Sequence, residues 1–238
     1  MQENFLNYNI NIYCGDSYKI FDNLQNDSIT VDHIITDPPY NISKDNNFNT
    51  MYSADRHGVD FGEWDKNFDL LSWIDKYISL LSPNGSIIIF NSYRNLSYII
   101  ERLELNNIEI KDILVWQKSN PMPRNRDRRY VQDMEFAIWG VNKNSKWVFN
   151  RPSNKPYLRS FFQSSIVSGI ERTEHPTQKS LKIMQEIIKI HTNKGETVLD
   201  CFMGSGTTGV ACQKLGRNFI GIEKDKKYFD IAKSRMIL

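Results

Sequence analysis

The sequence predicts an α/β fold with a doubly wound, mostly parallel sheet. Short apolar runs alternate with longer amphipathic stretches along the whole chain, which is typical of βα units. Near the C-terminus, VLDCFMGSGTTGV reads as a strand, a glycine turn and the start of a helix. The 238 residues contain neither an internal repeat nor a low-complexity linker, so we expect a single domain over residues 1–238.

The elements follow from local patterns. Apolar runs rich in Ile and Val mark strands, and apolar residues at helical spacing mark helices, as for Leu181, Met184 and Ile187. The expected strands are 10–14, 31–36, 86–91, 110–116, 135–141, 197–200 and 218–222. The expected helices are 17–24, 68–81, 94–105, 177–191, 207–215 and 226–234.

Three stretches do not fit this alternation, namely residues 41–64, 118–130 and 145–176. Irregular segments of this length in a compact domain are usually functional or disordered. We therefore expect them to be the places where a partner is bound.

Composition excludes several classes of protein. No apolar run approaches the ~20 residues of a membrane span, and the N-terminus lacks the blocks of a signal peptide. The three cysteines are scattered and not in C-x-x-C spacing, so we expect neither a disulfide framework nor a metal site. These features favour a cytoplasmic protein. The net charge of +2 neither requires nor excludes a polyanionic partner.

The glycine unit predicts a nucleoside-bearing ligand. Gly204, Gly206 and Gly209 match G-x-G-x-x-G, and Glu223 ends the following strand, where an acid can accept bonds from ribose hydroxyls. A glycine-rich turn without a ligand is the alternative. Few residues follow this unit, so the rest of the sheet must come from earlier in the chain. The ligand would then share a crevice with other strand ends.

The second expected strand ends abruptly at DPPY, residues 37–40. Two consecutive prolines stop a strand, because neither offers an N–H to the ladder. Either this is an ordinary loop entry with a capping Asp37 and a core Tyr40, or a carboxylate and a ring are held rigidly for chemistry.

Together these motifs resemble the S-adenosylmethionine-dependent amino-methyltransferases of DNA, in their permuted β group. DPPY matches the family's catalytic motif and FMGSG at 202–206 its cofactor motif, in the permuted order. CGDS at 14–17 and HPTQKS at 175–180 resemble its adenine-facing and methionine-end motifs. The resemblance implies a circularly permuted, Rossmann-like methyltransferase fold with inserted DNA-recognition loops, as in restriction–modification systems.

The resemblance also implies the chemistry. The adenine amino nitrogen is a poor nucleophile, because its lone pair is delocalised into the ring. Asp37, with the Pro38 carbonyl set by the Pro38–Pro39 backbone, would accept the amino hydrogens, and Tyr40 would stack on a base flipped out of the duplex. DPPY rather than SPPY favours adenine N6, with cytosine N4 as the alternative. NPPY would have indicated glutamine methylation.

S-adenosylmethionine is the expected cofactor. Glu223 would bind its ribose, Asp16 beside Ser17 its adenine, and His175, Thr177 and Lys179 its methionine end. The other expected contacts, along the loop and the strand ends, are Asp37, Asp200, Phe202, Gly204, Ser205, Gly206 and Thr207.

Double-stranded DNA is the expected partner. Four arginines gather in the stretch PMPRNRDRRY, and residues 145–176 mix basic with aromatic residues, as a recognition segment would. Residues 41–64 would be a flexible loop facing DNA. The expected DNA contacts are Arg124, Arg126, Arg128, Arg129, Lys146 and Arg151. A separately acting restriction endonuclease, a homodimer and RNA as substrate stay open, and a bacterial cytoplasm is implied.

Two other classes also stay open at this point. The literal G-x-G-x-x-G allows an NAD(P)-dependent oxidoreductase, which binding of NADH but not S-adenosylmethionine would reveal. A non-catalytic DNA-binding subunit could keep the same fold, although an intact DPPY argues against it.

Overall fold

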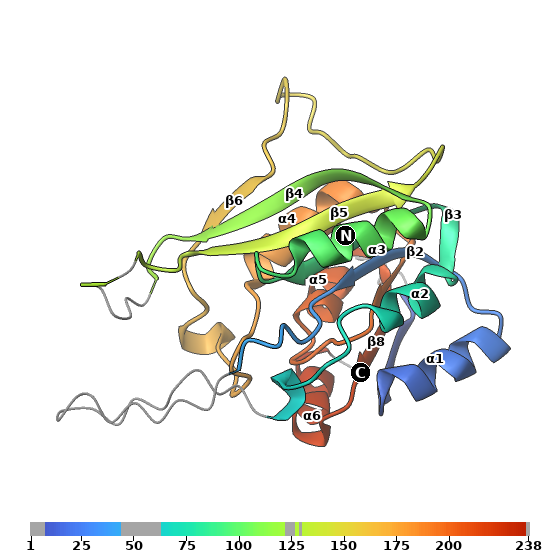
Figure 1. Ribbon diagram of the computed structural model, residues 1–238, viewed down its shortest axis with the longest axis horizontal. Coiled ribbons are helices and arrows are strands. Elements are labelled where there is room, and N and C mark those ends of the chain that lie inside the picture. Colours follow the sequence, from blue (N-terminus) through green and yellow to red (C-terminus); the bar gives the residue numbers. More distant parts are fainter. Residues whose placement is uncertain (1–7, 44–62, 122–126, 129, 237–238) are drawn as a thin grey trace, which may run out of the picture.

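The computed structural model describes residues 8–43, 63–121, 127–128 and 130–236. Its described part forms an eight-stranded sheet in the order β1-β8-β7-β2-β3-β5-β4-β6 (Figure 1). The strands are β1 (Ile10–Cys14), β2 (Val31–Thr36), β3 (Leu81–Asn91), β4 (Ile108–Lys118), β5 (Met134–Asn142), β6 (Phe161–Ser164), β7 (Thr197–Asp200) and β8 (Asn218–Glu223). All pairings are parallel except those of β5 with β3 and β4, so the predicted mostly parallel sheet is confirmed.

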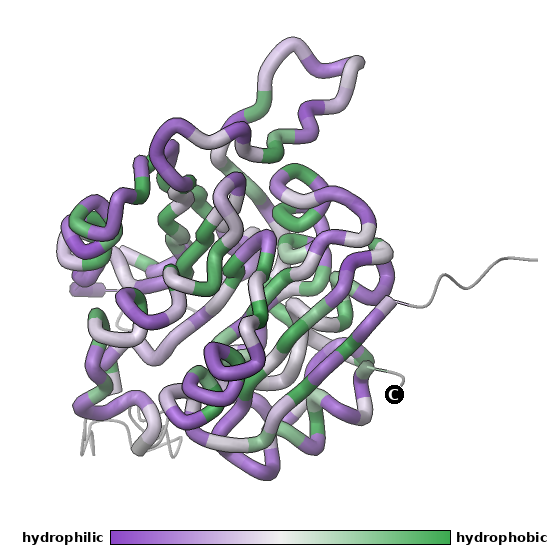
Figure 2. Tube along the Cα trace, turned by 90° about the vertical axis from the view of Figure 1, so that its right-hand side faces the viewer, coloured by the Kyte–Doolittle hydropathy of each residue, from purple (hydrophilic) through white to green (hydrophobic). Residues whose placement is uncertain are grey.

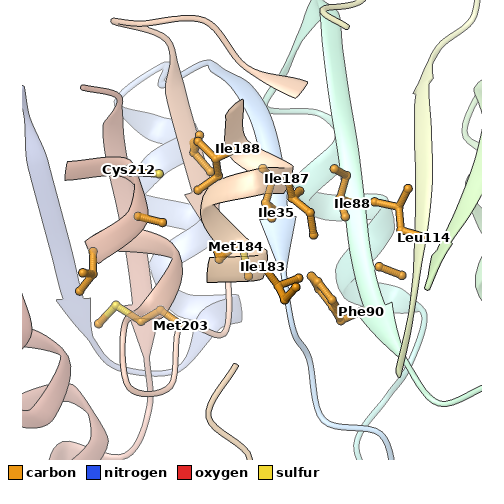
Figure 3. Packing of buried hydrophobic residues seen from close by; sticks show 14 of the residues in the cluster. Ile35, Ile88, Phe90, Leu114, Ile183, Met184, Ile187, Ile188, Met203 and Cys212 are labelled. Carbon is orange, nitrogen blue, oxygen red and sulfur yellow. The ribbon is translucent and has the colours of Figure 1, made fainter. Parts of the chain in front are cut away.

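Helices cover both faces of this sheet (Figure 1). One face packs against α1 (Ser17–Asn26), α2 (Ser72–Ile78) and α3 (Leu96–Leu105), through residues such as Ile34 and Ile87. The other packs against α4 (Leu181–His191), α5 (Thr207–Leu215) and α6 (Lys226–Arg235). In Figure 3, Ile183 and Ile187 of α4 lie over Ile35 and Ile88 of the strands. The fold is therefore doubly wound, as the sequence predicts.

Hydrophobic residues follow the interior of this layered structure. In Figure 2 they run along the inner segments of the chain, while hydrophilic residues occupy the outer loops. The central strands β2 and β3 are buried on both faces over residues 34–35 and 87–90, which explains why consecutive residues there are apolar. In the described part of the chain, no helix is long and apolar enough to cross a membrane.

The carboxyl ends of the parallel strands gather the predicted motifs. Asp16 follows β1, Asp37 follows β2, Asp200 ends β7 and Glu223 ends β8. Since β1, β8, β7 and β2 are successive neighbours in the sheet, these four acids line one edge. That edge is where open α/β sheets bind ligands.

Some elements differ from the prediction. Strand β6 was not expected, and it lies within the stretch interpreted as irregular. Helix α4 begins at Leu181 rather than at residue 177, because Ser180 has an extended backbone with ψ of 127°. The helix expected at 68–81 is only Ser72–Ile78, since Leu81 already pairs with Val31 as the start of β3. The short 3₁₀ turns Glu63–Asp65 and Gly169–Glu171 complete the described elements.

Candidate active site

Asp37 sits at the centre of the strand-end edge. Its Oδ1 accepts a hydrogen bond from the Tyr40 hydroxyl at 2.5 Å, and its Oδ2 lies 2.5 Å from the Lys179 ammonium. Burial raises the pKa of the Asp37 carboxyl above its ordinary value, and Lys179 opposes that rise. Burial also raises the pKa of Tyr40 well above its usual range, so the phenol stays a donor. The two prolines thus present a carboxylate and a ring together.

A second acid, Asp65, fixes the chain that leaves this motif. Its Oδ1 accepts from the backbone N–H groups of Tyr40 (2.6 Å) and Asn41 (2.9 Å). Its Oδ2 accepts from those of Ile42 (3.0 Å) and Ser43 (2.7 Å). Asp65 is 2% exposed, so four consecutive donors depend on one buried carboxylate. The sequence carries no motif for this role, and the residue was not predicted.

We expect Asp65→Ala to destabilise the protein and to lower turnover. Each buried donor that loses its acceptor and is not reached by water costs roughly 1–3 kcal/mol. Thermal or urea unfolding measures the loss, and steady-state assays should show a lower kcat with little change in cofactor affinity. Asp69→Ala is the matched control, because exposed Asp69 also accepts two backbone N–H groups but its donors can turn to water. Equal effects of the two variants would contradict this role for Asp65.

Asn95 supports the same motif from the neighbouring strand end. Its Nδ2 donates to the Tyr40 carbonyl at 2.8 Å and to Asn91 Oδ1 at 2.7 Å. The turn between β3 and α3 is thereby tied to DPPY, and it exposes Tyr93 and Arg94 beside the site. Nothing in the sequence pattern indicated this contact.

The glycine loop has the backbone that the motif predicts. Gly204 and Gly206 have φ of 51° and 76°, in the left-handed region that favours glycine. A Cβ on Gly204 would lie 2.8 Å from the His175 ring, and one on Gly206 would lie 2.9 Å from Ala232. The loop therefore packs so closely on its surroundings that side chains larger than hydrogen do not fit.

Glu223 closes this loop from β8. Its Oε2 accepts from Gly204 N at 2.9 Å, and its Oε1 accepts from Asp225 N at 2.6 Å. Burial raises the pKa of Glu223 to about 7, which these two hydrogen bonds partly oppose. A partly buried carboxylate beside a glycine turn fits a ligand that offers hydroxyl donors.

Ser205 and Thr207 are held from behind the loop. Arg235 Nη1 of α6 donates to the Ser205 carbonyl (2.6 Å), to Ser205 Oγ (3.0 Å) and to Thr207 Oγ1 (3.1 Å). Both residues are buried, so their expected contact with a ligand would have to come from the backbone or from further lone pairs. Arg235 was not predicted, because its role depends on how α6 packs.

Asp16 follows directly on the residues that pair with Glu223. Cys14 pairs with Glu223 in the sheet, and Gly15 N donates to the Glu223 carbonyl at 2.9 Å. Asp16 caps α1 through Tyr18 N and lies 3.1 Å from the Lys224 ammonium. The Ser17 hydroxyl, however, is buried and hydrogen-bonded to the Tyr77 hydroxyl at 2.9 Å.

Asp200 is buried at the end of β7. Its carboxylate accepts from the hydroxyls of Thr36 (2.7 Å) and Thr208 (2.6 Å) and from Phe202 N (3.1 Å). Burial raises the pKa of Asp200 to about 6. These contacts tie β7, β2 and α5 together under the site. The Phe202 ring packs edge-on against Phe68 and Trp73, each at 5.3 Å between centroids.

Residues of the HPTQKS segment contact two different parts of the site, the glycine loop and the carboxylates around Asp37. His175 contacts the Gly204 loop and packs edge-on against Tyr228 at 4.4 Å, and burial lowers its pKa to about 4, so the ring is neutral. Thr177 lies in the turn before α4. Lys179, expected at the methionine end of the cofactor, forms ion pairs with Asp37 and with Glu135.

The expected DNA contacts are only partly at this edge. Arg128 is exposed in a turn between β4 and β5, whereas Arg124, Arg126 and Arg129 lie outside the described residues, as does most of 41–64. Lys146 N bonds to Asn84, and Arg151 bonds to the Lys155 carbonyl. Asn84 lies near the start of β3, and Asn150, next to Arg151, donates to the Ile190 carbonyl near the end of α4, which leads into β7, so Lys146 and Arg151 lie at the opposite, amino-end edge from Asp37. The structure does not bring these two residues to the site.

Comparisons with known proteins agree on this architecture. A family model described as DNA methylase matches residues 31–234. Type II methyltransferase M2.MboI of Moraxella bovis is 35% identical, over 95% of this chain and 87% of that protein. The crystal structure of an M1.HpyAVI–SAM complex is 50% identical with a TM-score of 0.81, covering 96% of this chain and 100% of that one.

A more distant structure shows the fold alone. The PvuII DNA methyltransferase, described as cytosine-N4-specific, is 17% identical with a TM-score of 0.72, covering 97% of this chain and 87% of that chain.

Proposed function

The chain belongs to the DNA methylase family, and on this premise we propose that it methylates N6 of an adenine flipped out of duplex DNA. Its use of S-adenosylmethionine and its action on DNA are confirmed by the family and by the 50% identical methyltransferase in complex with SAM. An NAD(P)-dependent oxidoreductase is accordingly not favoured.

The observation that carries the proposal is the pairing of Asp37 with the glycine loop across adjacent strands. Strands β2 and β7 are neighbours, so the acceptor carboxylate and the loop open onto the same edge. When bound, S-adenosylmethionine supplies an electrophilic methyl group, whose bond to the sulfonium sulfur breaks on transfer and leaves S-adenosylhomocysteine. Asp37 and the Pro38 carbonyl accept the two amino hydrogens, which lets the nitrogen pyramidalise and attack. The nitrogen then loses one proton to water.

The proposed cofactor contacts follow the same edge. Glu223 accepts the ribose hydroxyls and Asp16 faces the adenine, with Gly204 and Gly206 allowing close approach of the backbone. His175 and Thr177 lie toward the methionine end. The contacts within the protein make Asp200 and Ser17 supports of this site. Ser205 and Thr207 contribute through the loop that Arg235 holds.

We propose adenine rather than cytosine because the motif here is DPPY, with Asp37 in its first position. Cytosine-specific members of the family that the sequence resembles have SPPY, with serine in that position. The fold itself does not separate the two bases. The test is long-read sequencing of DNA from cells that express the protein, with Asp37→Ala as the inactive control. We expect N6-methyladenine in one sequence context. N4-methylcytosine would overturn the choice of base, and unmodified DNA would overturn the function.

DNA binding is proposed at the carboxyl-end edge, from the basic loop 118–130 and the later part of the segment 145–176. Lys118 and Ser164 pair at the ends of β4 and β6, so both stretches leave the sheet on the same side as Asp37. Exposed Arg94, Arg128 and Arg172 flank this side. The first part of 145–176, with Lys146 and Arg151, lies elsewhere and is a weaker candidate.

We expect Arg126→Ala with Arg128→Ala to weaken binding of specific and random duplexes alike. Each phosphate contact contributes about 0.9 to the slope of log affinity against log salt, so the slope should fall by up to ~2. A loss of ~1–3 kcal/mol confined to one base position would instead indicate base reading. The control is Lys194→Ala with Lys214→Ala, exposed residues at the amino-end edge. An unchanged slope in the arginine variant would rule out phosphate contacts.

The type II methyltransferases among the relatives support a proposal about partners beyond DNA. We propose that the protein acts in the bacterial cytoplasm beside a separately acting restriction endonuclease of the same specificity. Monomeric and dimeric forms are distinguished by light scattering during size exclusion with and without duplex.

A further inference from the structure

A chain of alternating charges connects Asp37 to the end of β4. Lys179 Nζ lies 2.5 Å from Asp37 Oδ2 and 3.1 Å from Glu135 Oε2. Lys118 Nζ lies 2.6 Å from Glu135 Oε1. The Lys179 side chain is 9% exposed, and those of Glu135, Asp37 and Lys118 are 20%, 21% and 24% exposed. The charges of two carboxylates and two ammonium groups therefore cancel at a site that is largely shielded from water.

The four groups come from separate parts of the chain. Lys179 precedes α4, Glu135 lies in β5 and Lys118 is the last residue of β4. Lys118 N also donates to the Asp133 carbonyl at 2.7 Å, which closes the base of the connection carrying the basic loop. Glu135 is thus held on one side by Lys118, at the end of the connected pair β4 and β5, and it reaches Lys179 on the other.

The sharing of Lys179 has a chemical consequence. A buried carboxylate without a cation tends to take up a proton and then loses its value as an acceptor. A carboxylate that has a cation to itself stays ionised. That cation offsets much of its negative charge, however, so the carboxylate accepts hydrogen bonds from a third group less strongly. Lys179 bonded to both Asp37 and Glu135 satisfies both needs, because Asp37 stays charged without being fully neutralised.

We propose that Lys179 and Glu135 are positioning residues, which hold Asp37 charged and oriented toward the target amino group, with Lys118 fixing Glu135. This inference rests on the proposed function of Asp37. It gives Lys179 a different role from the methionine-end contact that the motif alone implies.

Other ionisable groups around Asp37 must be considered in any test by pH. Tyr40 faces it from its own segment and Asp200 from β7. Burial and the charge of Asp37 both raise the pKa of Asp200. Because Lys179 and Glu135 variants keep both groups, the contribution of those groups is common to all profiles. The ionisable groups facing Asp37 are thus Lys179, Glu135, Asp200 and the protonated phenol of Tyr40, with Lys118 behind Glu135.

The test is the pH profile of single-turnover methyl transfer by the full-length protein. Lys179 lowers the pKa of Asp37 and Glu135 raises it. Lys179→Met should therefore move the acid limb to higher pH, by ~1–3 units for a charge at this distance. Glu135→Gln should move it to lower pH. Lys118→Met, at a more exposed site, should act in the direction of Lys179→Met but less.

A general loss of structure would not move the acid limb to higher pH in Lys179→Met and to lower pH in Glu135→Gln. Lys179→Arg, which keeps the charge, should return the acid limb toward that of the wild type. Thermal unfolding identifies a variant that does not fold, and the Glu135 and Lys118 variants then carry the test. The proposal would be overturned if the acid limb of the pH profile did not move in these variants. It would also be overturned if the limb moved in the same direction in Glu135→Gln and Lys118→Met.

Calorimetry with S-adenosylmethionine separates the two roles of Lys179. We expect Glu135→Gln to leave cofactor affinity within about twofold. A tenfold or greater loss for Lys179→Met with an unmoved acid limb would assign Lys179 to the cofactor and overturn the proposal. A wild-type protein that methylates no DNA would instead overturn the proposed function.

Discussion

Replacing Asp37 by alanine is expected to lower methyl transfer by at least about a hundredfold. The amino nitrogen then lacks the acceptor that makes its lone pair available, while the glycine loop and Glu223 are untouched. Single-turnover assays with labelled S-adenosylmethionine measure the loss. Calorimetry should show cofactor affinity close to that of the wild type, because Lys179 keeps Glu135 as a partner.

Asp37→Asn is the informative companion of this variant. It keeps the shape of the side chain, yet its NH₂ group can point donors at the amino hydrogens, so we expect it to be nearly as inactive. Turnover within tenfold of the wild type in either variant would contradict the assignment of Asp37 as the acceptor.

Replacing Glu223 by alanine is expected to weaken S-adenosylmethionine binding by about ten- to a hundredfold. A charged acceptor to hydroxyl groups contributes ~1.5–3 kcal/mol, which corresponds to that range of dissociation constant. The variant also frees the Gly204 and Asp225 N–H groups that Glu223 binds. Isothermal calorimetry measures the change.

The pH dependence of cofactor binding separates the charge of Glu223 from its shape. Burial raises the pKa of Glu223 to about 7 in the ligand-free protein, so the carboxyl is largely protonated below that pH and ionised above it. Affinity should therefore rise with pH through about 7. Glu223→Gln should bind weakly and without this rise, and the same rise in the Gln variant would contradict the role.

Much of the fold was predictable because the buried strands carry strong local signals. Strands β1, β2 and β7 have the expected bounds, since each is an apolar run closed by a turn or an acid. Strand β6 was missed because its four residues, FFQS, alternate in burial at a sheet edge and resemble a loop. The start of β3 was missed because SPNG reads as a turn, although it lies within a strand with an irregular register.

The site was predictable only where residues form a contiguous motif. DPPY and the glycine loop lie at adjacent strand ends, as their order in the chain implies. The residues that hold them, Asp65, Asn95, Glu135 and Arg235, are distant in sequence and belong to no motif. Their roles depend on tertiary packing. The same reason explains why Lys146 and Arg151 were expected near DNA, although the chain carries them to the opposite edge.

The most direct test of the central claim is the identity of the methylated nucleoside made by purified protein. Duplex DNA from cells without methylation would be incubated with deuterated-methyl S-adenosylmethionine, digested to nucleosides and analysed by mass spectrometry. We expect the labelled methyl group on N6 of deoxyadenosine, and its absence with Asp37→Ala. Label on N4 of deoxycytidine, or equal labelling by the Asp37→Ala protein, would contradict the account.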